Sequence, residues 1–168
     1  ATERAVNTNY EGYDYPIIRY AEVLLNYAEA VFERDETISD EDLNISLNLV
    51  RNRINTQMPK LTNSFAQTYG LDMRTEIRRE RTVELFNEGF RIDDLKRWKT
   101  AETEMPQNIL TGTEYQTRWP NASYSKNSDG FLIIESGRKW EDKHYLYPLP
   151  TDQLQLNPNL KQNPGWGE

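Results

Sequence analysis

The chain has 168 residues, which is enough for one domain with a buried core. Its net charge of -7 argues against binding to nucleic acid, which rewards basic surfaces, and the absence of cysteine excludes disulfides, thiolate metal sites and a cysteine nucleophile within this chain. No stretch approaches the roughly 20 apolar residues of a membrane span.

Residues 16–57 are predicted to form a helix hairpin, after a polar lead-in over residues 1–15. The first helix begins at Pro16, since proline suits the first helical position, where its missing N–H costs nothing. Ala21 and Ala28 lie two turns apart and would let a neighbouring helix approach closely. Apolar residues at spacings of three and four form one stripe on this helix, namely Ile17, Tyr20, Leu24, Tyr27 and Val31.

The second helix of the hairpin follows a capping signal, in which Ser39 is followed three positions later by the acid Asp42. It ends before Met58 and Pro59, because a residue before proline disfavours helical backbone. Its apolar stripe is Leu43, Leu47, Val50 and Ile54. Together the two helices have the size of one tetratricopeptide-like unit.

Residues 72–102 are predicted to form a charged helix pair. One helix runs from near Asp72 to Gly89, a residue suited to a left-handed helix end, and a shorter one runs from about Ile92 to Ala101. On the first of these, a charged sector lies between apolar positions and should be partly buried. It consists of Arg81, Glu84 and Glu88.

Two interpretations of Glu84 and Glu88 are open. Paired carboxylates are the general acid and base of glycoside hydrolases. Alternatively, they belong to a buried Arg–Glu network, with Arg81, Arg91 and Arg97 as partners, that fixes the angle between the two helices. Arginines close by favour ionised carboxylates, whereas a general acid needs a proton, so the structural interpretation is preferred.

From residue 105 to residue 143 the helical period is lost. A loop of this length is either functional or conceals a missed element, and the apolar run from Phe131 to Ile134 is a candidate strand. Aromatic rings and polar side chains gather here, as a carbohydrate site requires, although the rings would also serve to pin the loop to the helices. The candidate ligand-binding residues are Tyr115, Arg118, Trp119, Asn121, Tyr124 and Trp140.

Other catalytic patterns are absent from the sequence. The only histidine, His144, stands beside apolar residues and is expected to be a surface or packing residue. No G-x-S-x-G elbow and no glycine-rich phosphate loop occurs, so we predict no nucleophilic triad, no cofactor and no metal site.

Three stretches together resemble the C-terminal region of the SusD/RagB family. The first is "YPIIRYAEVLLNYAEA" and the third is the tail, "YLYPLPTDQLQLNPNLKQNPGW". The second is "IRRERTVELFNEGFRIDDLKRW", which matches the family pattern at Glu80, Arg81, Glu84, Leu85, Glu88, Gly89, Arg91, Asp94, Leu95, Arg97 and Trp98. The loop at 105–143 falls outside these matches.

The resemblance implies an all-α domain over residues 1–168, built from tetratricopeptide-like helix pairs with loops and a closing tail at residues 145–168. It implies a non-enzymatic, outer-membrane lipoprotein that captures oligosaccharide or polysaccharide at the cell surface and covers a TonB-dependent transporter. It also suggests that the stiff, amide-rich tail folds back across the helices as a clamp, with Trp166 as its anchor.

Family members are several times longer and carry an N-terminal lipid-bearing cysteine. The chain is therefore expected to be a C-terminal fragment or an unusually short member, anchored through a part that precedes it, and to form a homodimer if apolar surface is left uncovered. No sugar-contacting residue can be transferred from the family by motif. Two further functions stay open: a helical scaffold that binds protein, the transporter above all, and a glycoside hydrolase using Glu84 and Glu88.

Overall fold

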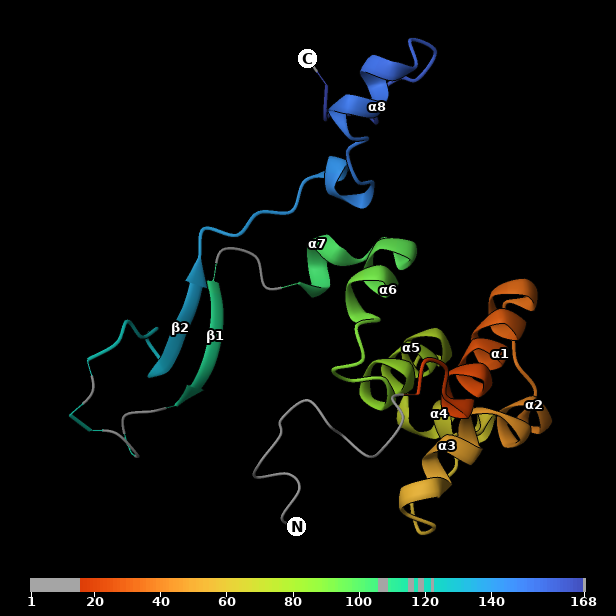
Figure 1. The fold of residues 1–168 in the computed structure, drawn as a ribbon. Helices are drawn as coiled ribbons and strands as arrows, with labels where there is room; N and C mark the ends of the chain where they lie inside the picture. The colour runs from red at the N-terminus through yellow and green to blue at the C-terminus, as the bar shows by residue number, and fades with distance from the viewer. Residues whose placement is uncertain (1–15, 106–108, 115–116, 118–119, 122, 168) are drawn as a thin grey trace, which may run out of the picture. The chain divides into compact units, whose positions relative to one another are not determined.

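A computed structural model describes residues 16–105, 109–114, 117, 120–121 and 123–167 (Figure 1). The chain divides into two compact units, residues 1–89 and residues 90–168. The first unit is helical and contains α1 (Tyr20–Asp35), α2 (Asp40–Ile45), α3 (Leu47–Ile54), α4 (Asn63–Tyr69) and α5 (Met73–Glu84). The second contains α6 (Arg91–Trp98), α7 (Ala101–Glu104), β1 (Ile109–Glu114), β2 (Phe131–Ser136), the 3-10 helix η2 (Asp142–Tyr145) and α8 (Thr151–Leu156).

The core of the first unit lies around α1, which packs on α3 and α5. The two alanines expected to admit a close neighbour, Ala21 and Ala28, are both buried. The predicted stripe is placed correctly only at Leu24, because Tyr20 and Tyr27 are 71% and 41% exposed. The apolar residues of α1 cover a wide sector of the helix, and residues along both edges of this sector recur at spacings of three and four. The packing partners of the helix therefore decide which edge is buried. The buried set on α1 is Ala21, Leu24, Leu25, Ala28, Glu29 and Phe32.

The first two predicted helices differ from the structure at their ends. α1 begins at Tyr20 instead of Pro16, and Arg19 is its N-cap with extended backbone. The capping signal at Ser39 is confirmed, since its Oγ accepts a hydrogen bond from the Asp42 amide at 3.0 Å. The helix after it is split into α2 and α3 at Ser46, whose φ of -129° and ψ of -101° are not helical.

The charged helix α5 begins as predicted and ends early. Asp72 is its N-cap and accepts a hydrogen bond from the Thr75 amide at 2.8 Å. The helix ends at Glu84, five residues before the predicted end at Gly89, which does adopt left-handed backbone with φ of +89°. Before α5 the structure contains α4, a helix that sequence analysis missed despite its capping residue Thr62.

The second unit begins with α6 and α7, where one helix was predicted over Ile92–Ala101. Lys99 interrupts it with left-handed backbone, φ of +58°, and closes α6. Leu95, Trp98 and Ala101 are buried in this part of the unit.

A two-stranded antiparallel sheet corrects the all-α prediction; the fold is helix-rich with a small sheet. The candidate strand at Phe131–Ile134 is confirmed as part of β2, and its partner β1 is the missed element of the loop. β1 has a glycine within it, which weakens a strand pattern. The structure explains that residue, because a Cβ on Gly112 would lie 2.9 Å from Cδ1 of Ile134 across the sheet.

The tail is not an uninterrupted ribbon, since it contains η2's last residue and α8. The side chain of Gln162 donates to the Leu149 carbonyl at 2.9 Å and accepts from the Leu149 amide at 2.7 Å. Asn163 Nδ2 donates to the Tyr147 carbonyl at 2.6 Å. The amides of the tail therefore hold it against residues 143–149 of the same unit, and a clamp across the helix pairs stays a prediction. Within the described residues, none of the helices has the length and hydrophobicity needed to cross a bilayer.

Candidate functional site

Only some of the six predicted ligand-binding residues are described by the structure. Tyr115, Arg118 and Trp119 lie outside the described residues. Asn121 and Tyr124 are exposed. Trp140 is partly buried and lines a pocket, which makes it the predicted residue that the structure places in a concave site.

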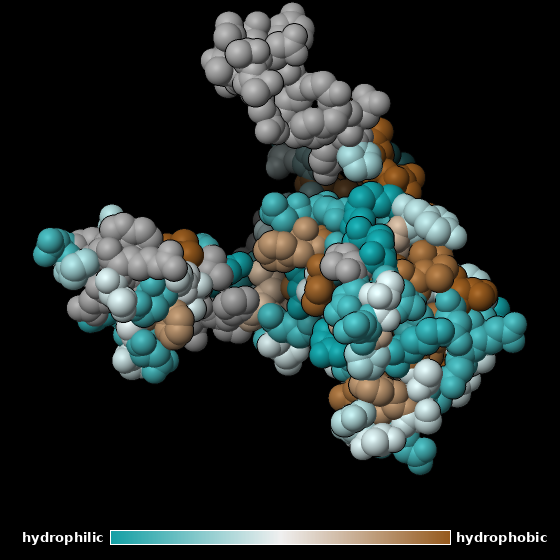
Figure 2. Space-filling view, turned by 90° about the horizontal axis from the view of Figure 1, so that it is seen from below, coloured by the Kyte–Doolittle hydropathy of each residue, from teal (hydrophilic) through white to brown (hydrophobic). Residues whose placement is uncertain are grey.

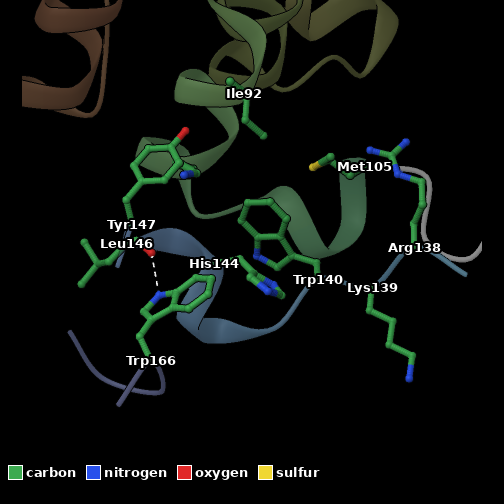
Figure 3. A pocket seen from close by; sticks show the side chains of 10 residues that line it. Ile92, Met105, Arg138, Lys139, Trp140, His144, Leu146, Tyr147 and Trp166 are labelled. Carbon is green, nitrogen blue, oxygen red and sulfur yellow. Dashed lines mark hydrogen bonds between the residues drawn. The ribbon is translucent and has the colours of Figure 1, made fainter. Parts of the chain in front are cut away.

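The pocket belongs entirely to the second unit and has a volume of about 350 Å³ (Figure 3). Side chains from α6, from the segment after β2, from η2 and from the chain end converge on it. Rings, aliphatic groups and basic groups make up its lining: Ile92, Lys96, Met105, Arg138, Lys139, Trp140, His144, Leu146, Tyr147 and Trp166.

His144 is fixed at this pocket by the turn that carries it. The backbone amide of Glu141 donates to His144 Nδ1 at 2.8 Å, while the Glu141 side chain accepts from the His144 backbone. This hydrogen bond occupies Nδ1 as an acceptor and leaves Nε2 as the ring nitrogen that can donate. Its ring lies edge-on to Trp140 at 5.7 Å and to Trp166 at 5.6 Å, as Figure 3 shows. His144 therefore packs between two indole rings, which fits the packing role expected for it.

Trp166 joins the chain end to the pocket. Its indole N–H donates to the carbonyls of Lys143 at 2.8 Å and Leu146 at 2.9 Å. Gly165, just before it, has left-handed backbone with φ of +79°, and a Cβ there would lie 2.8 Å from the Lys143 Cβ. Only glycine fits this approach, so the sequence pair Gly165–Trp166 positions the ring.

Sequence analysis missed most of the pocket. Lys96 lies 44 residues before Trp140, and Tyr147, which is 66% exposed, lies seven residues after it, so no local spacing connects the three. Lys96 Nζ lies 3.2 Å from the centre of the Tyr147 ring. The one available signal was the ring content of the tail itself, which was assigned to anchoring alone.

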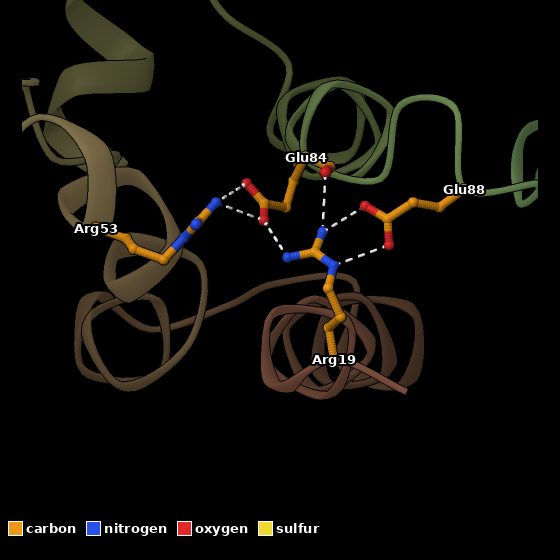
Figure 4. Close-up of polar contacts among 4 residues, drawn as sticks. All are labelled: Arg19, Arg53, Glu84 and Glu88. Atoms are coloured by element: carbon orange, nitrogen blue, oxygen red, sulfur yellow. Dashed lines mark hydrogen bonds and ion pairs between the residues drawn. The ribbon is translucent and has the colours of Figure 1, made fainter. Parts of the chain in front are cut away.

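The charged sector of α5 forms a separate site in the first unit (Figure 4). Arg19 donates to both oxygens of Glu88, at 2.8 and 2.6 Å, and to Glu84 at 2.9 Å. Arg53 donates to both oxygens of Glu84, at 2.8 and 3.0 Å. The predicted Arg–Glu network is present, but it joins α5 to α1 and α3.

The arginine partners expected from the sequence were wrong. Arg81 is buried and donates to Asn26 Oδ1 at 2.7 Å. Arg91 pairs with Glu104, and Arg97 pairs with Asp94. Tertiary packing brings Arg19 and Arg53, which are distant in sequence, to the carboxylates instead.

This geometry suits an ion-pair network better than proton transfer. The hydrogen bonds from Arg19 lower the pKa of Glu88 below its usual value of 4.5. Glu84 accepts hydrogen bonds from arginine on both oxygens. A general acid must hold a proton near neutral pH, and Glu88 is held in the opposite state.

Comparison with known proteins gives one family and several solved structures. A family model described as the SusD family matches residues 1–166. A SusD-like carbohydrate-binding protein from Bacteroides fragilis is 30% identical with a TM-score of 0.67, and the match covers 87% of this chain and 28% of that one. A second SusD-like protein from the same organism is 31% identical with a TM-score of 0.63, covering 94% and 28%. The chain thus spans about 28% of the length of these relatives. No curated protein sequence matches it.

Proposed function

The chain belongs to the SusD family, and from this membership we propose that it is a non-enzymatic glycan-binding module of a cell-surface oligosaccharide uptake complex. Its proposed partner is a TonB-dependent transporter of the outer membrane. The observation that carries the proposal is the pocket of the second unit, in which Trp140, Tyr147 and Trp166 surround a space of about 350 Å³.

The lining of this pocket has the chemistry that a sugar requires. A pyranose presents C–H faces, which pack on aromatic rings, and hydroxyl groups, which need donors and acceptors. Tyr147 supplies an exposed ring, and Trp140 packs edge-on against His144, whose position is fixed by the hydrogen bond from the Glu141 amide. The volume lies at the lower end of ligand pockets, which span about 300–1,000 Å³, so it suits one or two sugar residues.

Longer glycans need further contacts, and we assign these to the loop between β1 and β2. The family relatives include a protein described as carbohydrate-binding, which supports a sugar ligand. The proposed additional contacts are Tyr115, Arg118, Trp119, Asn121 and Tyr124.

The test is a panel of plant, host and microbial oligosaccharides measured by isothermal titration calorimetry, with the Tyr147→Ala variant beside the unmodified chain. Tyr69→Ala is a matched control, because Tyr69 and Tyr147 are both 66% exposed and Tyr69 belongs to α4 in the first unit. We expect Tyr147→Ala to weaken binding about fivefold or more, since one ring contributes about 1 kcal/mol.

The control variant should bind as the unmodified chain does. Equal loss of affinity in both variants would place the site elsewhere. Failure of the whole panel to bind would contradict the proposal that this chain is a glycan-binding module.

One observation favours the alternative of a protein-binding scaffold. Exposed apolar residues follow one edge of α1, where Tyr20, Val23 and Tyr27 are 71%, 49% and 41% exposed. An apolar concavity of about 280 Å³ lies between α1 and α3, beside Tyr20 and Leu49. Figure 2 shows apolar residues interrupting the hydrophilic surface. Transporter binding lost on Val23→Glu, with no glycan bound, would favour this function.

A further inference from the structure

The charges around the pocket of the second unit restrict its ligand further. Among the described residues that line it, the charged ones are Lys96, Arg138 and Lys139, and all three are basic. The chain as a whole has a net charge of -7. A cluster of positive charge on an acidic chain attracts anionic ligands locally.

Lys96 and Arg138 have donors to offer a ligand. Lys96 lies over the Tyr147 ring, and no carboxylate lies within ion-pairing distance of it among the described residues. The contact described for Arg138 is between Nε and Glu135 at 3.6 Å, so the guanidinium nitrogens at its tip are available. Lys139 points away from the rings in Figure 3, so it adds positive charge near the pocket without contacting the rings.

Glu135, which lies 3.6 Å from Arg138, offsets part of this charge, whereas the two acids that follow Trp140 pair with lysines outside the lining. Glu141 pairs with Lys143 at 2.9 Å, and Asp142, which is 90% exposed, lies 3.6 Å from Lys99. His144 Nδ1 is occupied by the hydrogen bond from the Glu141 amide. The lining therefore carries aromatic surface together with positive charge.

Resting on the proposed function, we propose that this pocket selects an acidic saccharide, one that bears a carboxylate or sulfate group. Tyr147 packs on the sugar ring, while Lys96 and Arg138 donate charge-assisted hydrogen bonds to the anionic group. With a neutral sugar, Lys96 would keep only its contact with the Tyr147 ring, and Arg138 only its contact with Glu135 at 3.6 Å.

The experiment measures affinity by calorimetry for matched oligosaccharides of equal length: oligogalacturonate, neutral oligogalactose, and a sulfated oligogalactose. The two acidic arms distinguish a carboxylate from a sulfate ligand. The variants are Lys96→Met, which removes the ammonium group and keeps an unbranched side chain, and Arg138→Gln. Lys60→Met is the charge-matched control, because Lys60 is exposed and does not line the pocket.

We expect at least one acidic arm to bind tenfold or more tightly than the neutral arm. Each pocket variant should weaken the binding of acidic saccharide about tenfold to a hundredfold, which is the range for one charge-assisted hydrogen bond. The control variant Lys60→Met should bind acidic saccharide as tightly as the unmodified chain does. Neutral sugar bound as tightly as acidic sugar would overturn the inference and leave the proposed function intact. Acidic binding unchanged by Lys96→Met and Arg138→Gln would also overturn it. No binding by any arm, nor by the wider panel, would contradict the proposed function itself.

Discussion

Arg19 shows how much of the first unit depends on one side chain. It is the N-cap of α1, and its guanidinium donates to Glu84 at the end of α5 and to Glu88 in the segment that follows α5. The Glu84 side chain is only 8% exposed, so an unpaired charge there would be costly. The carboxylates that sequence analysis weighed as catalytic are thus held by arginines as structural ion pairs.

Replacing Glu88 with glutamine should destabilise the fold in a pH-dependent manner. The Arg19 hydrogen bonds lower the pKa of Glu88 below 4.5, so the folded state binds this proton less readily than the unfolded chain. The stabilisation is therefore fully present above pH 4.5 and is lost as the pH falls through the lowered pKa. At neutral pH we expect Glu88→Gln to cost about 1 kcal/mol, because the pair is partly exposed.

The measurement is the melting temperature of both proteins between pH 7 and pH 2. The gap between them should close as the pH falls below 4.5. Glu22→Gln serves as the control, because Glu22 has no ion pair among the described residues. A gap that stays constant with pH would contradict a charged Glu88 in the folded state.

At the scale of elements, sequence patterns identified helices better than they identified helix ends. The capping signal at Ser39 and the helix start expected near Asp72 both begin helices in the structure. The helix ends at Ser46 and Glu84 carry no such signal in the sequence. The role of the tail residues is likewise visible only in the tertiary structure. The side-chain amides of the tail bond to the backbone of residues 147–149, and its Gly165 allows a close approach to Lys143.

Gly165→Ala should loosen the tail and disturb the pocket. The added Cβ would lie 2.8 Å from the Lys143 Cβ, and φ of +79° disfavours alanine. We expect a loss of more than about 1 kcal/mol in the local stability of the tail. Hydrogen exchange of residues 143–166 measures it, together with glycan affinity.

Gly130→Ala is the matched control for this variant. Gly130 has a similar φ of +86°, but nothing lies within 4 Å of a Cβ built there. It reproduces the backbone strain without the steric contact. Equal effects on the tail from both variants would show that the contact at Lys143 does not position Trp166.

At the scale of the whole molecule, the two candidate sites lie in different units. The Arg19 network belongs to the unit of residues 1–89, and the ring-lined pocket belongs to that of residues 90–168. The two sets share no residue. Stability of the first and ligand binding by the second should therefore be separable.

Variants of the two sites should act independently. Arg19→Met should lower the free energy of unfolding by about 1–3 kcal/mol, because Glu88 loses its partner while Glu84 keeps Arg53. It should leave glycan affinity unchanged. Tyr147→Ala, in contrast, should weaken glycan binding and leave the free energy of unfolding unchanged. In the double variant the two changes should add to within about 0.5 kcal/mol, as measured by denaturant unfolding and calorimetry. A larger deviation would show energetic coupling between the units.

The sequence by itself determined the family, the helical character, the capping residue Ser39, the strand at Phe131–Ile134 and the presence of a buried Arg–Glu network. These follow from local spacing, from composition or from motifs that stand together in the chain. Trp140 was proposed in the same way, as one ring in an aromatic segment, and its role in ligand binding stays a prediction.

Only the tertiary structure decided which groups meet. It exchanged the expected arginine partners for Arg19 and Arg53, placed Tyr27 outside the core, and added β1 to the predicted loop. It also brought Lys96 and Trp166 to one pocket with Trp140. The physical reason is common to all of these, because ion pairs, strand pairing and pocket lining join residues that are far apart in sequence. A periodic pattern in the sequence indicates which side chains are buried or paired, but it does not identify the residues that they contact.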